Sequence, residues 1–196
     1  MYKAYGHVRS RALRVLWMLE ELGQSYEYIN HRPATDAMVA VNPSGKAPAL
    51  DVDGTILTDS CAIMCYLADR HGQFTVQSGT LERARQDGLM HQINDELDAI
   101  LWMAGRHSFV LPEERRMPEI KDSLRWEFAR NCDRIAAQIQ GEFLMGSQFT
   151  VPDILLTHCM NWSVGAKFKC ENKDLLAYAK RMRQRPAYQR AFGLED

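Results

Sequence analysis

The sequence has no excess of charge of either sign. Its 24 lysines and arginines and 25 aspartates and glutamates leave a formal net charge of −1 over 196 residues. Such a chain has no bulk attraction for nucleic acid or for an anionic membrane, so neither partner is expected. A basic cluster near the C-terminus has no aromatic stacking platform beside it, and it is predicted to be a solvated helix face. It comprises Lys180, Arg181, Arg183, Arg185 and Arg190.

Long apolar runs and paired cysteines are also missing. No run approaches the length of a membrane span, and the first ten residues contain no apolar signal segment, so no membrane association is expected. The five cysteines are odd in number and lack a C-x-x-C spacing, which suits a reduced cytoplasmic protein better than a disulfide framework. Cys61 and Cys65 lie one helical turn apart with no histidine near them in sequence, and the six histidines are scattered. No metal site is predicted.

The stretch from Asn42 to Ser60 is the most informative part of the chain. It begins with the turn residues NPSG and continues through a strand, a two-residue Asp-Gly hairpin turn and a second strand. Pro48 lies directly before the first strand and is a candidate for a cis peptide bond. The backbone of Ala47 would then be free to pair with an extended ligand, while Asp59 and Ser60 place a carboxylate and a helix N-terminus nearby. The stretch predicts a small peptide-binding site.

The two halves of the chain have different hydrophobic periods. Residues 1–74 alternate between strand and helix patterns in the order β-α-β-α-β-β-α, which predicts a small mixed α/β domain. From residue 81 strand signals nearly vanish, and residues 81–196 are predicted to form an all-α domain. Its helix patterns cover 81–104, 120–139, 150–164 and 172–185. Thr150 and Asp153 have the spacing of a capping box, so their role is predicted to be structural.

Four blocks of the sequence together resemble the cytosolic glutathione S-transferases, in particular the serine-type, bacterial-like members. The blocks are RSRALRVLWMLEELG at 9–23, NPSGKAPAL at 42–50, TDSCAIMCYL at 58–67 and FTVPDILLTH at 149–158. They occur in the family's order, and the likeness covers essentially the whole chain. The resemblance implies a thioredoxin-like N-terminal domain, an all-helical C-terminal domain, and a cytoplasmic homodimer that uses glutathione as a co-substrate.

The resemblance also implies roles for residues of the peptide-binding stretch. Pro48 should be cis, the Ala47 backbone should pair with the cysteinyl part of glutathione, and the Asp59-Ser60 pair should hold the γ-glutamyl end. The chemistry agrees, because the amide and hydroxyl of Ser60 at a helix start suit a carboxylate, and Asp59 suits the neighbouring α-ammonium. A simple helix cap is the alternative for Asp59 and Ser60, and both roles can hold at once.

The group that activates glutathione is expected in the loop Gly6–Arg11, after the first strand. A free thiol has a pKa near ~8.5, and lowering it by about two units takes about 2.7 kcal/mol of thiolate stabilisation. One hydrogen bond to the charged sulfur plus a helix N-terminus supplies that amount. By resemblance Ser10 is the first choice as donor, with a helix cap as its alternative, and His7 and Arg11 are weaker candidates. Many relatives have Ser-Pro where this chain has His7-Val8.

By the same resemblance, the electrophile pocket is expected between Ser10 and the helices of residues 81–108. Trp102, Arg106 and His107 are candidates for its wall, and a core position is an equal alternative for Trp102. The function predicted from these features is conjugation of glutathione to a small hydrophobic electrophile, as in detoxification. The alternatives are a non-catalytic protein-interaction module of the same fold and a glutathione-dependent isomerase or peroxidase.

Overall fold

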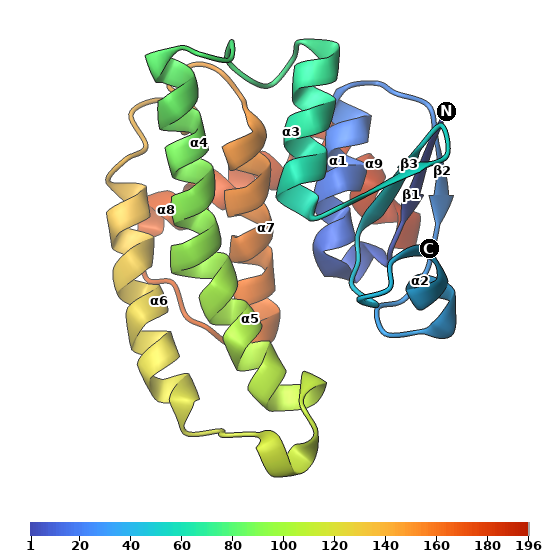
Figure 1. The fold of residues 1–196 in the computed structure, drawn as a ribbon. Coiled ribbons are helices and arrows are strands. Elements are labelled where there is room, and N and C mark those ends of the chain that lie inside the picture. The colour runs from blue at the N-terminus through green and yellow to red at the C-terminus, as the bar shows by residue number, and fades with distance from the viewer. Residues whose placement is uncertain (196) are drawn as a thin grey trace. The chain divides into compact units, whose positions relative to one another are not determined.

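The computed structural model of the protein describes residues 1–195, which fall into two compact units (Figure 1). The first unit comprises Met1–Thr75 together with the chain from Arg183 onward, and the second comprises Val76–Met182. The sequence predicted domains at 1–74 and 81–196. The second prediction differs from the structure in its last residues, because the segment after Met182 belongs to the first unit.

The first unit contains a four-stranded mixed sheet in the order β2-β1-β3-β4 (Figure 1). Its elements are β1 Tyr2–Tyr5, α1 Leu13–Glu21, β2 Tyr26–Ile29, α2 Asp36–Val41, β3 Ala49–Val52, β4 Thr55–Thr58 and α3 Ser60–His71. Strand β1 pairs with β2 in parallel, whereas β3 is antiparallel to both β1 and β4. This is the predicted order β-α-β-α-β-β-α, and the prediction of a mixed α/β domain is confirmed.

The hairpin between β3 and β4 forms where the sequence predicts it. Asp53 and Gly54 have φ values of 51° and 91°, and positive φ at both central residues is the pattern of the two-residue turn that matches strand twist. Asp51 reinforces the turn, because its Oδ1 accepts a hydrogen bond from the Gly54 amide at 2.6 Å. The turn fixes the register that pairs Val52 with Thr55, and this register determines which residues lie at the far end of the sheet.

Helix α1 lies between α3 and the C-terminal helix α9, Pro186–Phe192 (Figure 1). Trp17 of α1 packs edge-to-face on Tyr188, with ring centroids 5.0 Å apart. Arg185 donates from Nε and Nη2 to the Glu21 carboxylate at 2.6 and 2.8 Å. The prediction of a solvated basic face is therefore wrong for Arg185. Its two-point ion pair, together with the contact between Trp17 and Tyr188, attaches the C-terminal segment to the rest of the first unit.

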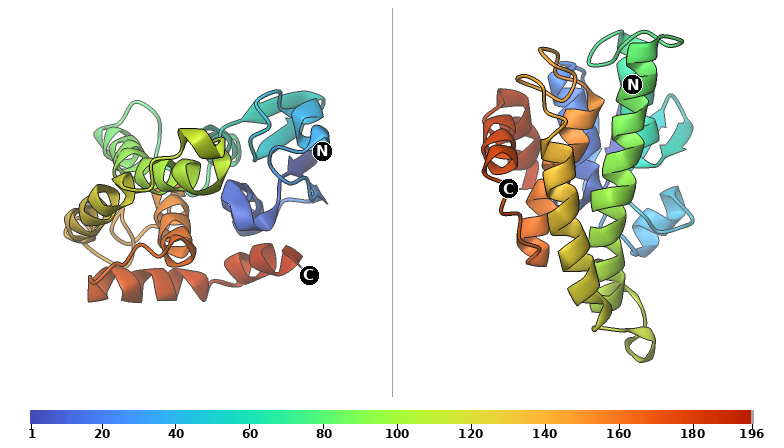
Figure 2. Two further views of the ribbon diagram at one scale, coloured as in Figure 1. Left: turned by 90° about the horizontal axis from the view of Figure 1, so that it is seen from below. Right: turned by 90° about the vertical axis from the view of Figure 1, so that its left-hand side faces the viewer.

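The second unit is all-helical, as predicted. Its helices are α4 Leu81–Ile93, α5 Ala99–Gly105, α6 Ile120–Ala136, α7 Val151–Ala166 and α8 Lys173–Arg183. Wide helical turns at Asn94–Asp98 and Arg106–Val110 continue α4 into α5 and beyond. Helices α6 and α7 run alongside this long helix (Figure 2). The predicted helix 172–185 ends at Arg183, because the residue before Pro186 takes an extended conformation.

A buried carboxylate organises the start of α7. Asp153 is fully buried, and it accepts hydrogen bonds from the Thr150 amide at 2.7 Å and the Leu144 amide at 2.9 Å. The Tyr178 hydroxyl of α8 donates to the same carboxylate. Burial raises the pKa of Asp153, and these hydrogen bonds oppose the rise by stabilising the charged form. The prediction of a structural capping box is confirmed.

None of the helices within residues 1–195 combines the length and the apolar content needed to cross a bilayer.

Candidate functional site

The sheet register brings three predicted site segments to one end of the sheet. Tyr5 of β1 pairs with Ala49 of β3, and Ala49 also pairs with Thr58 of β4. Because β3 is antiparallel to its two neighbours, β1 and β4 end where β3 begins. The loop Gly6–Arg11, the Ala47-Pro48 pair and the Asp59-Ser60 pair adjoin this row. We call these three segments the sheet-end site.

Gly6 shows how closely the segments of the sheet-end site approach one another. Its φ is 139°, and a Cβ added here would lie 2.6 Å from the Ala12 Cβ and 3.1 Å from the Ala47 Cβ. A side chain therefore has neither the space nor the backbone conformation at this position. The loop after β1 packs with its bare backbone against Ala47, so the loop and the segment before β3 form one continuous surface.

The bond between Ala47 and Pro48 is cis, as expected from the sequence. Asn42 braces the turn that leads to it: its Nδ2 donates to the Lys46 carbonyl at 2.7 Å, and its Oδ1 accepts from the Ser44 amide at 3.2 Å. The NPSG residues thus act as a turn that a side-chain amide holds in shape. This turn fixes the position of the Ala47 backbone at the end of the sheet.

Asp59 caps helix α3 with one of its two carboxylate oxygens. Its Oδ1 accepts from the Cys61 amide at 2.9 Å and from the Ala62 amide at 3.0 Å. The backbone of Asp59 has a φ of 68°, which is unusual for a residue other than glycine. The capping alternative is therefore correct for Asp59. The cap uses Oδ1, and Oδ2 is the oxygen that a ligand would contact.

Ser60 is buried at the first position of α3, where its hydroxyl oxygen meets a buried cation. Arg14 is only 1% exposed, and its Nη1 donates to the Ser60 Oγ at 3.0 Å. Since the oxygen accepts this bond, the hydroxyl hydrogen is directed to another acceptor. The backbone amides of the next two residues already donate to Asp59. The amide and hydroxyl of Ser60 are thus the donors that this helix start offers an anion.

Arg14 is the site residue that sequence reasoning missed. The available signal was its position as a lone charge inside the apolar run Leu13–Leu19, every residue of which is buried. A cation at such a position needs hydrogen-bond partners, and Ser60 is one of them. Only the fold shows that α1 and α3 lie close enough for this bond.

The Ser10 hydroxyl already makes two hydrogen bonds within its own loop. It donates to the His7 carbonyl at 2.6 Å and accepts from the Ala12 amide at 3.1 Å. Ser10 itself has extended backbone angles, φ −123° and ψ −173°, inside the helical turn Val8–Ala12. This is the geometry of a helix cap, and it corresponds to the alternative weighed for Ser10. To donate to a ligand, the hydroxyl must first leave the His7 carbonyl.

His7 precedes this turn and accepts a hydrogen bond from the Arg9 amide at its Nδ1, at 3.0 Å. A neutral His7 with an accepting Nδ1 carries its proton on Nε2, which can donate. Arg11 is half-buried at the start of the helix. Ser10, His7 and Arg11 therefore all lie in the loop of the sheet-end site. The Ser10 hydroxyl already donates a hydrogen bond to the His7 carbonyl, whereas the Nε2 of a neutral His7 can donate to a ligand.

The predicted pocket residues lie at the end of the long helix of the second unit. Trp102 belongs to α5, and Arg106 and His107 belong to the wide turn that follows it. All three are partly buried. The Nδ1 of His107 accepts a hydrogen bond from the Met117 amide at 3.0 Å, which ties down the following loop. His107 therefore has a structural contact of its own, and a pocket role for the three residues stays a prediction.

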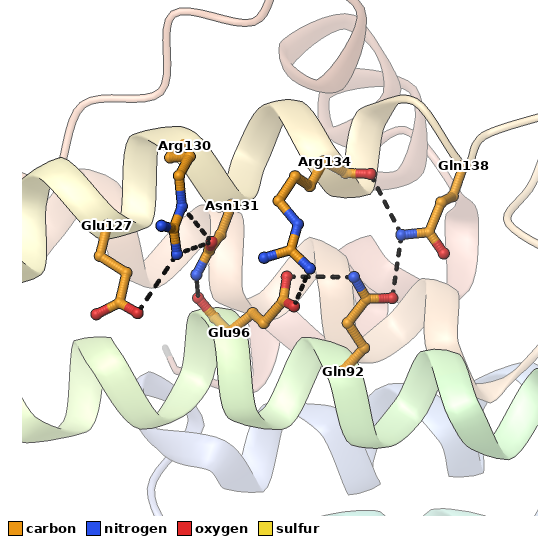
Figure 3. Close-up of polar contacts among 7 residues, drawn as sticks. All are labelled: Gln92, Glu96, Glu127, Arg130, Asn131, Arg134 and Gln138. Atoms are coloured by element: carbon orange, nitrogen blue, oxygen red, sulfur yellow. Dashed lines mark hydrogen bonds and ion pairs between the residues drawn. The ribbon is translucent and has the colours of Figure 1, made fainter.

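A cavity of about 370 Å³ lies in the second unit between the long helix and α6, and a polar network crosses it (Figure 3). Arg134 pairs with Glu96 at 3.0 Å, and the Asn131 amide donates to the Glu96 carbonyl at 2.9 Å. The lining residues are Asp95, Glu96, Ala99, Ile100, Met103, Leu124, Glu127, Arg130, Asn131 and Arg134. They include none of the predicted pocket residues and no hydroxyl or thiol side chain. The ion pair and the amide contact join α6 to the long helix.

The part of the chain that the structure describes contains no group of three histidine, cysteine, aspartate or glutamate side chains that could hold a metal ion. The sheet-end site offers backbone groups, hydroxyls, an imidazole and a carboxylate. These are groups that bind a small polar peptide.

The topology of the first unit and the cis proline at the end of its sheet define a thioredoxin-like domain, which an all-helical unit follows. Residues 9–70 match the family described as the glutathione S-transferase N-terminal domain. A relative by sequence is the glutathione S-transferase GstA of Escherichia coli O157:H7. It is 29% identical over 165 residues, which cover 82% of this chain and 79% of that protein.

Solved structures support the same relationship. A glutathione transferase from Methylococcus capsulatus str. Bath is 27% identical, with a TM-score of 0.85 over 100% of this chain and 98% of that one. A theta class glutathione S-transferase from the citrus canker pathogen Xanthomonas axonopodis pv. citri, solved with glutathione bound, is 26% identical. Its TM-score is 0.81, over 97% of this chain and 96% of that one. Residues 9–70 thus match the N-terminal domain of the glutathione S-transferases, and the whole chain is similar in sequence and fold to bacterial members of that family.

Proposed function

We propose that the protein is a glutathione transferase that binds glutathione at the sheet-end site and transfers its thiolate to a small hydrophobic electrophile. The observation that carries this proposal is the meeting of three segments at one end of the sheet. The loop after β1, the cis Ala47-Pro48 bond and the Asp59-Ser60 helix start form a single surface there. Glutathione presents a γ-glutamyl end, a cysteinyl backbone and a thiol, and each of the three segments suits one of these groups.

Two of these segments would bind glutathione. The Ala47 backbone would pair with the cysteinyl part, because an extended peptide pairs with backbone groups at the end of a strand. Ser60 would donate its amide and hydroxyl to the γ-glutamyl carboxylate, and Arg14 orients that hydroxyl from the protein interior. The Oδ2 of Asp59 would accept from the adjacent ammonium group, while Oδ1 keeps the helix capped. The helix start also favours a negative charge by about 0.3–1 kcal/mol.

The loop Gly6–Arg11 would supply the group that stabilises the thiolate. We propose Ser10 for this role, with His7 as the second donor and Arg11 as a source of positive potential. A hydrogen bond to a charged sulfur contributes about 1.5–3 kcal/mol, but Ser10 must give up its bond to the His7 carbonyl, worth about 1 kcal/mol. The net gain from Ser10 is then about 1 kcal/mol. The ring Nε2 of His7 and the helix start would supply the rest.

For the electrophile, we propose Trp102, Arg106 and His107 as pocket residues. We infer that the protein is a cytoplasmic homodimer with a role in detoxification, as the family resemblance implies. Light scattering on the purified chain tests the assembly. A dimer has twice the 22.5 kDa of one chain, and a particle of 22.5 kDa in the presence of glutathione would contradict it.

Calorimetric titration with glutathione tests the binding site. Replacement of Ser60 by alanine removes one hydrogen bond to the ligand carboxylate and leaves Arg14 facing a methyl group. The expected loss is about 1.5–3 kcal/mol, or roughly 10- to 150-fold in dissociation constant. Ser123 is an exposed helix serine in the second unit, so Ser123→Ala is a matched control and should bind like the wild type. Equal affinity in the Ser60→Ala variant would remove Ser60 from the site.

The reaction itself is measured with a chromogenic aryl halide. The proposal expects the wild type to form the glutathione conjugate and the Ser60→Ala variant to require more glutathione for the same rate. Glutathione binding without conjugation of any electrophile tested would contradict transferase activity and leave only the binding site. No heat of binding at millimolar glutathione would contradict both.

A further inference from the structure

Two cysteines of the second unit face each other outside the sheet-end site. Cys132 of α6 is 1% exposed, whereas Cys170, in the loop before α8, is half-buried. Their thiols form a side-chain hydrogen bond, and neither is in a disulfide. Cys132 is thus shielded from solvent, whereas Cys170 is partly exposed. The proposed glutathione site uses neither residue.

Contacts on both sides of Cys170 fix its loop against α6. Two residues before it, Phe168 packs edge-to-face on Phe128, with ring centroids 5.7 Å apart. Two residues after it, the Asn172 amide donates to the Asp133 carboxylate at 2.9 Å. Phe128 lies one helical turn before Cys132, and Asp133 directly follows it. The two anchors bracket both cysteines, so the contact between the thiols is part of the packed fold.

The surroundings shift the pKa values of the two thiols in opposite directions. The hydrogen bond from Cys132 lowers the pKa of Cys170 to about 7, and burial opposes this shift. The same hydrogen bond, together with burial, raises the pKa of Cys132. At pH 7 a thiol with a pKa of about 7 is half ionised, against about 3% at the ordinary value of about 8.5. Nucleophilicity falls about five-fold over this difference in pKa, so Cys170 should react about three-fold faster than an ordinary thiol.

We propose that Cys170 and Cys132 form a dithiol site that a low-molecular-weight disulfide oxidises to an intramolecular disulfide. The Cys170 thiolate attacks one sulfur of that disulfide, forms a mixed disulfide and releases one small thiolate. Cys132 then loses its proton to solvent and attacks the Cys170 sulfur, which displaces the second small thiolate. Two cysteine thiols are oxidised and one small disulfide is reduced to two thiols, so electrons and protons balance.

The test uses bis(2-hydroxyethyl) disulfide, which has no likeness to glutathione. The reduced full chain is incubated with it near neutral pH, quenched with acid and an alkylating agent, and mapped by peptide mass spectrometry. In the wild type we expect the loss of two hydrogens and a linked pair of peptides that carry Cys132 and Cys170. The Cys132→Ser variant, and Cys132→Ala as a second version, should instead hold the small thiol on Cys170.

Two further variants sharpen the result. Cys170→Ser should leave Cys132 unmodified, because the buried Cys132 thiol reacts only with a mixed disulfide formed on Cys170. Cys65 is half-buried like Cys170 but belongs to α3, so Cys65→Ser should form the link as the wild type does. The proposal is overturned if wild-type protein gives no link between Cys132 and Cys170. It is also overturned if the Cys132 variants carry no adduct on Cys170.

Discussion

Replacing Ser10 should alter two measurable quantities by different amounts. In the structure the Ser10 hydroxyl donates to the His7 carbonyl at 2.6 Å and accepts from the Ala12 amide at 3.1 Å. Loss of a serine cap costs about 1 kcal/mol, which lowers the melting temperature of a chain of this size by about 2–4 °C. Glycine at a cap costs only a few tenths of a kcal/mol. We therefore expect Ser10→Ala to melt earlier and Ser10→Gly to melt close to the wild type.

The second quantity is the pKa of bound glutathione. A hydroxyl bond to the thiolate is worth about 1.5–3 kcal/mol, and giving up the His7 carbonyl costs about 0.5–1.5 kcal/mol. The difference is about 1 kcal/mol, which is slightly less than one pKa unit. Both Ser10→Ala and Ser10→Gly lack the hydroxyl, so both should raise the thiol pKa by close to one unit. Ser10→Thr keeps the hydroxyl and should not.

The assay is ultraviolet absorbance of bound thiolate across pH, with thermal melts of the same samples. The melting temperature should be lower in Ser10→Ala than in Ser10→Gly. The pKa of the bound thiol should be higher in both of these variants than in Ser10→Thr. If alanine lowers stability but neither variant moves the thiol pKa, Ser10 is only a helix cap. A raised thiol pKa in His7→Phe alone would then assign the donor role to His7.

The remaining predictions concern stability and use denaturant unfolding. Gly6→Ala should destabilise the protein by about 1–3 kcal/mol, because the new Cβ would lie 2.6 Å from the Ala12 Cβ at a φ of 139°. Gly88 of α4 has open space around it, so Gly88→Ala should instead stabilise by about 0.5–1 kcal/mol, and a loss there would count against this reasoning. Asp153→Ala should cost about 3 kcal/mol or more, because it leaves the Tyr178 hydroxyl and two backbone amides buried without their acceptor. A loss below about 1 kcal/mol would contradict that account of the carboxylate.

Local sequence patterns predicted the elements of the first unit well. The Asp53-Gly54 turn, the cap at Asp59 and the capping box of Thr150 and Asp153 each depend on residues within four positions of one another. Their geometry follows from backbone preferences and short-range hydrogen bonds, which the sequence displays directly. Pro48 was assigned its cis bond for the same reason, together with the family resemblance.

Contacts between distant segments were not predictable in this way. The bond from Arg14 to Ser60 spans 46 positions, and the ion pair of Arg185 with Glu21 spans 164. Hydrophobic periodicity shows that a helix buries one face, but not which polar side chain it will meet there. For this reason the sequence placed the C-terminal segment in the wrong domain. The hydrogen bond from the Ser10 hydroxyl to the His7 carbonyl was not predictable either, because it depends on the backbone conformation of the loop.

The central claim is that the sheet-end site binds glutathione as its thiolate. The most direct measurement is the ultraviolet titration of glutathione bound to the wild-type protein at saturating ligand. The proposal predicts that the thiol ionises about two units below its free value of about 8.5, that is, near pH 6.5. An unchanged pKa of the bound thiol, with binding itself established by calorimetry, would contradict the claim.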